Sequence, residues 1–400
     1  MIDEKNKVME ETERIKSREE EEEEEIWSWG AGTEGQLGTG KLQDEHKPQL
    51  IHSLSSFGPI SHISCGGAHV IALTPGGRVL TWGRGTSGQL GHGEMVNCLH
   101  PKSVEYLEGI FITHASAGWN HSGFVSDTGY VFTSGDGSFG QLGHEDYISR
   151  CSPAQVLHFK ARHVEQIACG MRHSLVLLKE DLIYGFGSGK RGQLGISDDK
   201  LKSVSTPQVT LGFENVKIRS VTANGDHSAA ISMNGHLYIW GRSFHGAPDV
   251  YTPRRVTADL LFSQVALGWN HALVLTGDGE VYMLGRYNYN VPTGAQKANG
   301  MNHISEDEGV LQRVLDFNST KVVQIGAGAE HSAVVTDDGS VMTWGWGEHG
   351  QLGLGDTNDQ TGPRAVSLCN EPSRKPCVGR VYCGSGFTFV IRTYTVKSSS

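Results

Sequence analysis

The feature that most constrains this chain is a glycine-rich string that returns along the sequence at an almost fixed spacing. Its first copy, SWGAGTEGQLG, spans residues 28–38, and related copies begin at residues 82, 134, 186 and 344. The first glycines of the copies are separated by 53, 52, 52 and then 158 residues, and the last gap is about three periods. A period of this size is typical of a chain built from repeated supersecondary units.

The string contains Gly-x-Gly-x-x-Gly, the fingerprint that follows a strand in many dinucleotide-binding sites. One enzyme does not carry five such sites at a fixed period, and each copy is followed by Gln-Leu-Gly rather than by a helix-forming stretch. The string GSGKRG at 187–192 lacks the spacing of a phosphate-binding P-loop. We therefore interpret these glycines as architecture and expect no cofactor. No convergent set of residues predicts catalysis.

A second signature, Gly-x-x-His, keeps the same period. Its six histidines are His69, His121, His173, His227, His271 and His331. One copy has Asn224 in place of the glycine, and a seventh copy ends in Phe387. Nothing in the pattern brings several histidines within reach of one metal ion. We predict that they are structural, that each bonds backbone within its own unit, and that the chain holds no metal.

Short β-rich stretches around each histidine predict four strands in every unit of about 52 residues. Asp-Gly and Asn-Gly pairs between such stretches predict hairpins in which both central turn residues take positive φ. The third unit, SLVLLKEDLIYGFG at 174–187, lacks the turn glycine and is expected to use a different loop. Such units cannot bury both sheet faces alone. The sequence therefore predicts an all-β fold, a seven-bladed β-propeller.

The two ends of the chain are complementary halves of one unit. The start, IWSWGAGTEGQLG at 26–38, has no Gly-x-x-His half before it, and the end, VYCGSGFTFVIR at 381–392, has no Trp-Gly half after it. We predict that they share a blade and close the ring, which removes exposed sheet edges. The predicted organisation is an acidic disordered tail over 1–25, the propeller over 26–393 and a flexible C-terminal tail over 394–400.

The motifs W-G-x-G-x-x-G-Q-L-G and C-G-x-x-H-S, over about residues 26–392, resemble those of the RCC1 (regulator of chromosome condensation) family, whose members are seven-bladed propellers. Two copies read Gly-Trp-x-His, at Trp119 and Trp269, and are similar to the plant ultraviolet-B-receptor-like branch. That branch groups Trp and Arg in Gly-Trp-Arg-His motifs of adjacent blades. Here Asn120 and Asn270 occupy the arginine positions, and the two copies are three blades apart.

The charge of the chain is uneven. Residues 1–25 carry twelve acidic and five basic side chains, or −7, so the net charge of −10 leaves −3 for the rest. We interpret the tail as a solvated segment, with a docking segment for a basic partner as the alternative. The nearly neutral body predicts no direct nucleic-acid binding. The absence of a membrane-length apolar run, of a signal peptide and of any C-x-x-C among seven cysteines favours the nucleus and/or the cytoplasm, without membrane association.

Departures from the repeat supply the candidate partner-binding residues. The position after the signature glycine holds Trp119 and Trp269, whereas the other units have Gly, Ala, Ser or Met there. The loops at 241–253 and 285–310 have lost Gly-Gln-Leu-Gly, and the longer one contains Tyr287 and Tyr289. Loop insertions in repeat proteins often map to binding faces, and Trp and Tyr are enriched at hot spots. The alternatives are drift of the loops and packing of each indole between neighbouring blades.

Three functions are open at this point. We favour a non-catalytic protein-interaction scaffold in intracellular signalling or regulation, a monomer with protein partners. The resemblance implies a second function, that of a guanine nucleotide exchange factor for a small GTPase, which needs a binding face rather than a catalytic acid or base. A third, ultraviolet-B photoreception, lacks its Trp and Arg cluster. The founding member of the family also uses a basic tail on chromatin, and the acidic tail here argues against chromatin binding.

Overall fold

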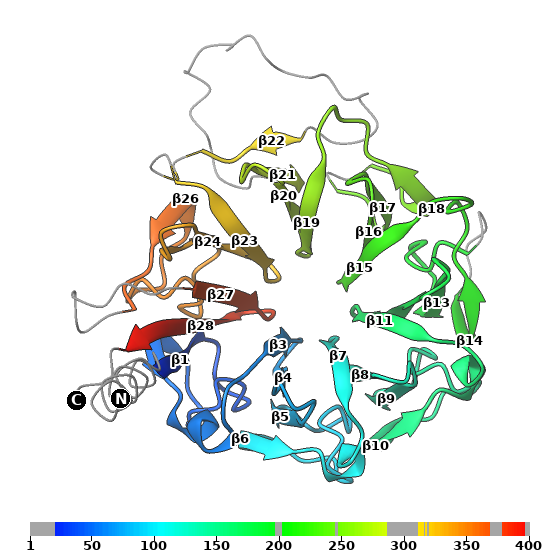
Figure 1. Ribbon diagram of the computed structural model, residues 1–400, viewed down its shortest axis with the longest axis horizontal. Coiled ribbons are helices and arrows are strands. Elements are labelled where there is room, and N and C mark those ends of the chain that lie inside the picture. Colours follow the sequence, from blue (N-terminus) through cyan, green and yellow to red (C-terminus); the bar gives the residue numbers. More distant parts are fainter. Residues whose placement is uncertain are drawn as a thin grey trace, which may run out of the picture.

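The computed structural model describes residues 21–196, 202–244, 247–285, 311–315, 317, 320–368 and 378–396. These residues form seven four-stranded antiparallel sheets, which stand as blades in a ring around a central axis (Figure 1). The predicted all-β, seven-bladed propeller is confirmed. We number the blades by their inner strands in chain order, so that blade 1 begins with β3 and blade 7 combines both ends of the chain.

Each blade has the same strand order from the axis outward. The inner strands are β3 (His62–Cys65), β7 (Ile112–Ala117), β11 (Val164–Cys169), β15 (Ile218–Asn224), β19 (Phe262–Leu267), β23 (Val322–Ala327) and β27 (Val378–Cys383). The second strands are β4 (His69–Leu73), β8 (His121–Ser126), β12 (His173–Leu178), β16 (His227–Ser232), β20 (His271–Thr276), β24 (His331–Thr336) and β28 (Phe387–Val396).

The third strands are β5 (Val79–Gly83), β9 (Val131–Gly135), β13 (Ile183–Ser188), β17 (Leu237–Gly241), β21 (Val281–Gly285), β25 (Val341–Gly345) and β1 (Glu21–Gly30). The outer strands are β6 (Cys98–Ser103), β10 (Arg150–Gln155), β14 (Ser203–Val209), β18 (Val250–Arg255), β22 (Gln312–Arg313), β26 (Gln360–Ala365) and β2 (Glu45–Leu50). Within the described residues, three 3-10 helices lie in links between blades: η1 (His52–Phe57), η2 (Glu105–Leu107) and η3 (Leu157–Phe159).

Strand β1 closes the ring, as the sequence predicts. Its ten residues pair with β28 in one unbroken antiparallel register, from Glu21 opposite Val396 to Gly30 opposite Phe387. The boundaries differ from the prediction, because β1 begins at Glu21 and β28 runs to Val396. Residues 21–25, which the prediction assigned to the acidic tail, therefore belong to a strand. The backbone hydrogen bonds of the sheet form there although the side chains are all acidic. The rest of both predicted tails lies outside the described residues.

The hairpin between the second and third strands differs from the predicted turn. In blade 2, Ser126 N–H donates to Tyr130 O at 2.9 Å, and Gly129, with φ 82°, donates to Ser126 O at 2.9 Å. This is a three-residue loop, which needs positive φ at its last residue only. In blade 3, Asp181 takes φ 63° and donates to Leu178 O at 3.0 Å, as Gly129 does to Ser126. The expectation of a different loop there was wrong.

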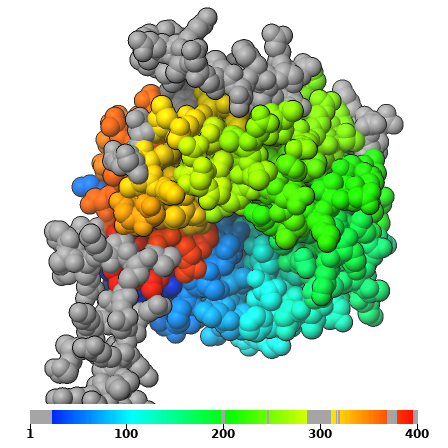
Figure 2. Space-filling model, turned by 45° about the horizontal axis from the view of Figure 1, so that its top comes forward, coloured from blue at the N-terminus to red at the C-terminus, as the bar shows by residue number. Residues whose placement is uncertain are grey.

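The apolar core lies between blades rather than within one. Strands β8, β12, β16, β20 and β24 are buried at every residue, because each blade is covered by a neighbour on both faces. At the seam, Trp82 of blade 1 meets Phe389 of blade 7 edge-on, with ring centroids 5.9 Å apart. Figure 2 shows the consequence: the blades form one continuous surface, and blue N-terminal segments adjoin the red C-terminal strands.

The antiparallel order of the strands decides at which end of a blade each connection lies. The Gly-x-x-His turns and the glycine loops all lie at one end of the blades, which we call the glycine-loop face, and the hairpins and the links between blades lie at the opposite end. The predicted site residues Trp119 and Trp269 belong to Gly-x-x-His turns. The glycine-loop face is therefore the place to look for a site.

Candidate functional site

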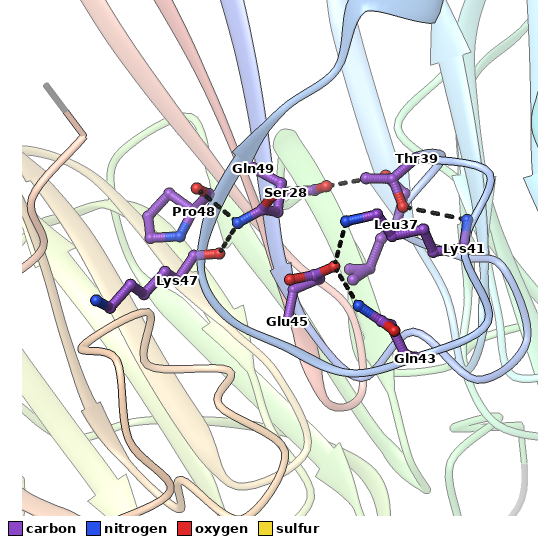
Figure 3. A network of polar contacts seen from close by, with 9 residues as sticks. All are labelled: Ser28, Leu37, Thr39, Lys41, Gln43, Glu45, Lys47, Pro48 and Gln49. Carbon is purple, nitrogen blue, oxygen red and sulfur yellow. Dashed lines mark hydrogen bonds and ion pairs between the residues drawn. The ribbon is translucent and has the colours of Figure 1, made fainter. Parts of the chain in front are cut away.

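The glycine loops fold back on their own blades. In blade 7, Gly32 N–H donates to Asp44 Oδ1 at 2.9 Å, and Glu34 N–H donates to Gln36 Oε1 at 2.9 Å. Ser28 Oγ donates to Leu37 O at 2.8 Å, and Glu45 accepts from the side chains of Lys41 and Gln43 (Figure 3). A Cβ on Gly32 would lie 1.9 Å from Gln43 O. Only glycine fits this loop.

The same internal bonding recurs in other glycine loops. Gly85, Gly137 and Gly347 donate to Asn97, Ser149 and Asp359, at 3.0, 3.2 and 2.8 Å. The glutamines of Gly-Gln-Leu-Gly accept from loop amides in the same way, at 2.9 Å in each case: Gln89, Gln141, Gln193 and Gln351. Amides that a phosphate would need are thus already bonded within the loops.

We therefore predict that NAD, ATP and GTP do not bind to the glycine loops. Titrating each nucleotide into the full chain should release no heat above that of dilution, because a phosphate would have to displace carboxylate and amide acceptors from Gly32, Gly85 and Gly347. Isothermal titration calorimetry checks this. A micromolar affinity for any of the three would contradict the architectural interpretation.

Each glycine loop also fastens its blade to the next one. The buried carbonyl of Gln193 in blade 3 accepts from both Ser228 Oγ at 2.7 Å and Trp240 Nε1 at 2.9 Å in blade 4. Gln351 O in blade 6 accepts from Thr388 Oγ1 at 3.0 Å and Trp29 Nε1 at 2.9 Å in blade 7. Three core tryptophans of the repeat, Trp29, Trp82 and Trp240, are thus anchored by the preceding blade, whereas the indole nitrogen of Trp344, which follows a blade without this loop, has no such bond.

The six repeat histidines join neighbouring blades instead of bonding backbone within their own. His69 Nε2 lies 2.9 Å from Ser122 Oγ of the next blade, and His331 Nε2 lies 2.9 Å from Thr388 Oγ1. His121, His173 and His271 meet Ser174, Ser228 and Ser332 in the same way, at 2.9, 2.9 and 3.1 Å. The prediction of bonding within one unit is corrected, because the hydroxyl residue at the position after the signature His or Phe faces the preceding blade.

The exceptions obey the same rule. Blade 5 has Ala272 where five other blades have Ser or Thr, and there His227 Nε2 turns to Trp269 O at 2.7 Å. At the seam, Phe387 replaces histidine and Val70 replaces serine, and both belong to one apolar cluster. Polar groups buried without a partner are costly, so His227 has a different partner in blade 5, and at the seam both members of the pair are apolar. This paired change was readable in the sequence and was missed there.

Burial keeps these histidines neutral. It lowers the pKa of His69, His173 and His331 to about 3 and that of His121 and His271 to about 4, and it also lowers the pKa of His227. Groups held neutral between blades do not supply acid or base at neutral pH. Within the described residues, no three His, Cys, Asp or Glu side chains are grouped so that they could hold a metal ion.

The two tryptophans predicted to bind a partner meet each other. The ring centroids of Trp119 in blade 2 and Trp269 in blade 5 are 5.3 Å apart, and their planes are tilted by 45°. Three blades separate them along the chain, but a seven-bladed ring sets those blades across a narrow axis. Each indole also lies against the turn of the preceding blade, Gly67 for Trp119 and Gly225 for Trp269, so packing between neighbouring blades remains the alternative to docking. Both rings are half-buried and cap the axial cavity, which has a volume of about 330 Å³.

Small residues in the equivalent turns make room for this pair. A Cβ on Gly67 would lie 2.9 Å from the Trp119 ring, and a Cβ on Gly225 would lie 3.3 Å from the Trp269 ring. Backbone bonds between neighbouring turns hold the pair, since Trp119 N–H donates to Gly170 O at 3.1 Å and Trp269 N–H donates to Ala329 O at 2.8 Å. The indoles therefore stand on a rigid frame.

Charged side chains surround the pair on the glycine-loop face. Arg84 donates to Asn120, and Arg172 stacks over the Phe139 ring with its guanidinium carbon 4.8 Å from the centroid. Glu330 Oε1 accepts from Asn270 Nδ2 at 3.0 Å. Tyr287 and Tyr289, also predicted to bind a partner, lie outside the described residues. In the described part of the chain, no helix is both long enough and apolar enough to cross a membrane.

These geometries agree with known proteins. The RCC1-like domain family matches this chain over residues 25–390. The chain belongs to that family. It is 32% identical over 338 residues to the ultraviolet-B receptor UVR8 of Arabidopsis thaliana, and this alignment covers 82% of this chain and 74% of the receptor. It is 30% identical over 389 residues to the secretion-regulating guanine nucleotide exchange factor of Mus musculus, and this alignment covers 92% of this chain and 83% of that protein.

A solved RCC1-like structure shares the whole fold. Prp20p from Saccharomyces cerevisiae, described together with its binding to Gsp1p and histones, superposes with a TM-score of 0.79 at 23% identity, and the match covers 96% of this chain and 95% of Prp20p. At this identity the likeness concerns the fold alone. The predicted family is therefore confirmed, and the identity of the partner is a separate question.

Proposed function

We propose that this RCC1-like propeller is a non-catalytic interaction scaffold whose protein partner docks on the glycine-loop face. The observation that carries the proposal is the Trp119 and Trp269 pair, which is partly exposed at the centre of that face and held by backbone bonds. Trp is enriched at interface hot spots because it buries a large area with little rotamer loss. A site in the nucleus or the cytoplasm, and Tyr287 and Tyr289 as further contacts, complete the proposal.

Replacing both tryptophans should abolish partner capture and leave the fold intact. We expect Trp119→Ala with Trp269→Ala to lose roughly 2 kcal/mol or more of partner affinity, and less stability than the fully buried Trp82→Ala, for which about 3–5 kcal/mol is expected. Capture from cell extract, with protein identification, checks the first effect, and thermal melting checks the second. Tyr106→Ala removes an exposed ring at the opposite face and serves as the control.

The outcome decides between docking and packing. If the double variant melts as low as Trp82→Ala, the indole pair is core and docking on it is wrong. If the double variant is stable but captures the same proteins as the full chain, the partner binds elsewhere.

A guanine nucleotide exchange factor is the second candidate, and the similarity to the mouse exchange factor over 92% of this chain favours it. Exchange requires only that a face bind the nucleotide-free GTPase better than the loaded one. Release of a fluorescent guanine nucleotide from purified small GTPases tests it. Acceleration that the double tryptophan variant loses would assign exchange to this face.

The similarity to the ultraviolet-B receptor does not lead us to propose photoreception. Asn120 and Asn270 follow the paired tryptophans, and the arginine at the equivalent position of blade 3, Arg172, stacks on Phe139 instead. The Trp and Arg grouping implied by the family resemblance is therefore replaced by a tryptophan pair with amide neighbours.

A further inference from the structure

A second cavity on the glycine-loop face lies beside the tryptophan pair. It has a volume of about 350 Å³, and Trp269, Trp346, Glu330 and His349 line it together with small residues such as Gly67 and Gly386. Trp346 stands directly after the Trp-Gly of blade 6, where other blades have Ala31, Arg84, Asp136, Ser188 and Arg242. The cavity thus arises from two positions at which this chain departs from its own repeat.

The two indoles are fixed in place from several directions. Trp346 N–H donates to Glu330 O at 2.9 Å, and the Trp346 ring meets the His349 ring edge-on with centroids 5.4 Å apart. His349 Nδ1 lies 2.9 Å from Asp44 Oδ2, and Asp44 is itself held by Gly32 N–H at 2.9 Å. On the other side, Trp269 rests against Trp119. Because these contacts already exist in the free protein, little ordering cost remains for binding.

Glu330 is the one acidic side chain among the described residues that line the cavity. Glu330 is exposed at the rim, and Asn270 Nδ2 donates to it at 3.0 Å. Asp44 stands behind His349. None of the described residues that line the cavity is Lys or Arg. An apolar group that covered the cavity would strip water from the Glu330 carboxylate without replacing it, which is unfavourable. A cation would compensate the carboxylate and would also be attracted to the indole faces.

We propose that this cavity binds the cationic side chain of an arginine or a lysine presented by a protein partner. This inference rests on the proposed docking function and names the chemistry of the partner, a basic segment. Trp269 and Trp346 supply the ring faces, and Glu330 supplies the counter-charge. Arginine suits the site best, because a guanidinium stacks on aromatic faces while it pairs with a carboxylate. A second copy of this chain is the competing occupant.

Two short probes that differ in charge alone test the proposal. Acetyl-Ala-Arg-Ala-amide and its citrulline twin are titrated at millimolar concentration into the full chain labelled with ¹⁵N at tryptophan indoles. We expect the Trp269 and Trp346 indole signals to move with the arginine probe, and the citrulline probe to bind at least about 5-fold more weakly, since each exposed cation–π contact accounts for about 2- to 5-fold. Glu330→Gln should weaken arginine binding to a similar degree.

Matched variants separate the cavity from the rest of the face. Glu348→Gln makes the same change at an exposed acid that does not line the cavity, and it should leave binding unchanged. Trp346→Ala should abolish the shift of the Trp269 signal, and Trp346→Phe should retain part of that shift. Equal binding of arginine and citrulline, or equal loss in Glu330→Gln and Glu348→Gln, would overturn the proposal.

Sedimentation velocity tests whether a second copy of this chain occupies the cavity. Self-association that disappears in Trp346→Ala would identify a second copy of this chain and overturn the inference. If the arginine probe fails while partner capture still depends on Trp119 and Trp269, the docking function stands and only the cationic chemistry is wrong.

Discussion

Deleting residues 1–30 is expected to abolish the cooperative folding of the whole propeller, and deleting residues 1–20 is expected to leave its melting temperature unchanged. Strand β1 lies between β2 and β28 in its sheet, so its removal separates the remaining strands of blade 7. It also removes Trp29, which is fully buried and donates to Gln351 O of blade 6 at 2.9 Å. Without β1, strand β28 becomes an exposed sheet edge, and such edges favour aggregation. An open ring also exposes two apolar blade faces, which favour association.

An intermediate deletion tests the corrected boundary of the tail. Removing residues 1–25 eliminates the Glu24 carboxylate, which accepts from Ile60 N–H at 2.8 Å and lies 3.5 Å from Arg380. We expect a small but measurable fall in melting temperature, because these groups are only partly buried. Calorimetry of the three truncations checks the series. A chain without residues 1–30 that melts like the full chain would disprove closure by β1.

Acid is expected to unfold the propeller above the pH range in which carboxylates usually titrate. Burial lowers the folded-state pKa of the repeat histidines to about 3 in His69, His173 and His331, whereas the ordinary value is 6.5. The unfolded chain therefore takes up protons first as the pH falls. Stability is fully present above about pH 6.5 and is lost as the pH falls toward 3.

The expected loss is large because the histidines act together. Each contributes up to about 1.4 kcal/mol per pH unit in that window. Even two of these histidines would lower the free energy of unfolding by about 5 kcal/mol over two pH units. That loss is comparable with the whole stability of a typical domain, about 5–15 kcal/mol. We expect a cooperative unfolding transition with a midpoint at about pH 5. Circular dichroism or tryptophan fluorescence measures this transition. A fold that persists to pH 3 would contradict the neutral, buried histidines.

The seam of the propeller supplies a matched variant for this test. Phe387 and Val70 show that an apolar pair can replace a histidine and its hydroxyl partner. His331→Phe with Thr388→Val copies that pair and leaves Gln351 O bonded to Trp29 Nε1. It should reduce the steepness of acid unfolding by the share of one proton, and His52→Gln, at an exposed histidine, should not. Equal slopes for all three proteins would show that His331 does not contribute.

The sequence by itself determined the number of blades, the four strands of each and the closure by the two termini. These follow from local rules that repeat, namely turn glycines, alternating apolar residues and half-units at the two ends. Gly32 illustrates the reason: its loop is closed by groups within about twelve residues, so the pattern is complete in one stretch of chain.

Only the tertiary structure decided which residues meet across the ring. His69 and Ser122 are 53 positions apart, and each looks ordinary alone, so the pairing of blades stayed hidden although the sequence repeats it. Trp119 and Trp269 meet because seven blades bring distant turns to one narrow axis. Trp346 and Glu330 lie in adjacent turns of blade 6, but the packing of blade 5 beside them decides that Trp269 lines the same cavity. Repeat spacing specifies where a side chain lies within its blade, but contacts across the axis depend on the angle at which all blades pack.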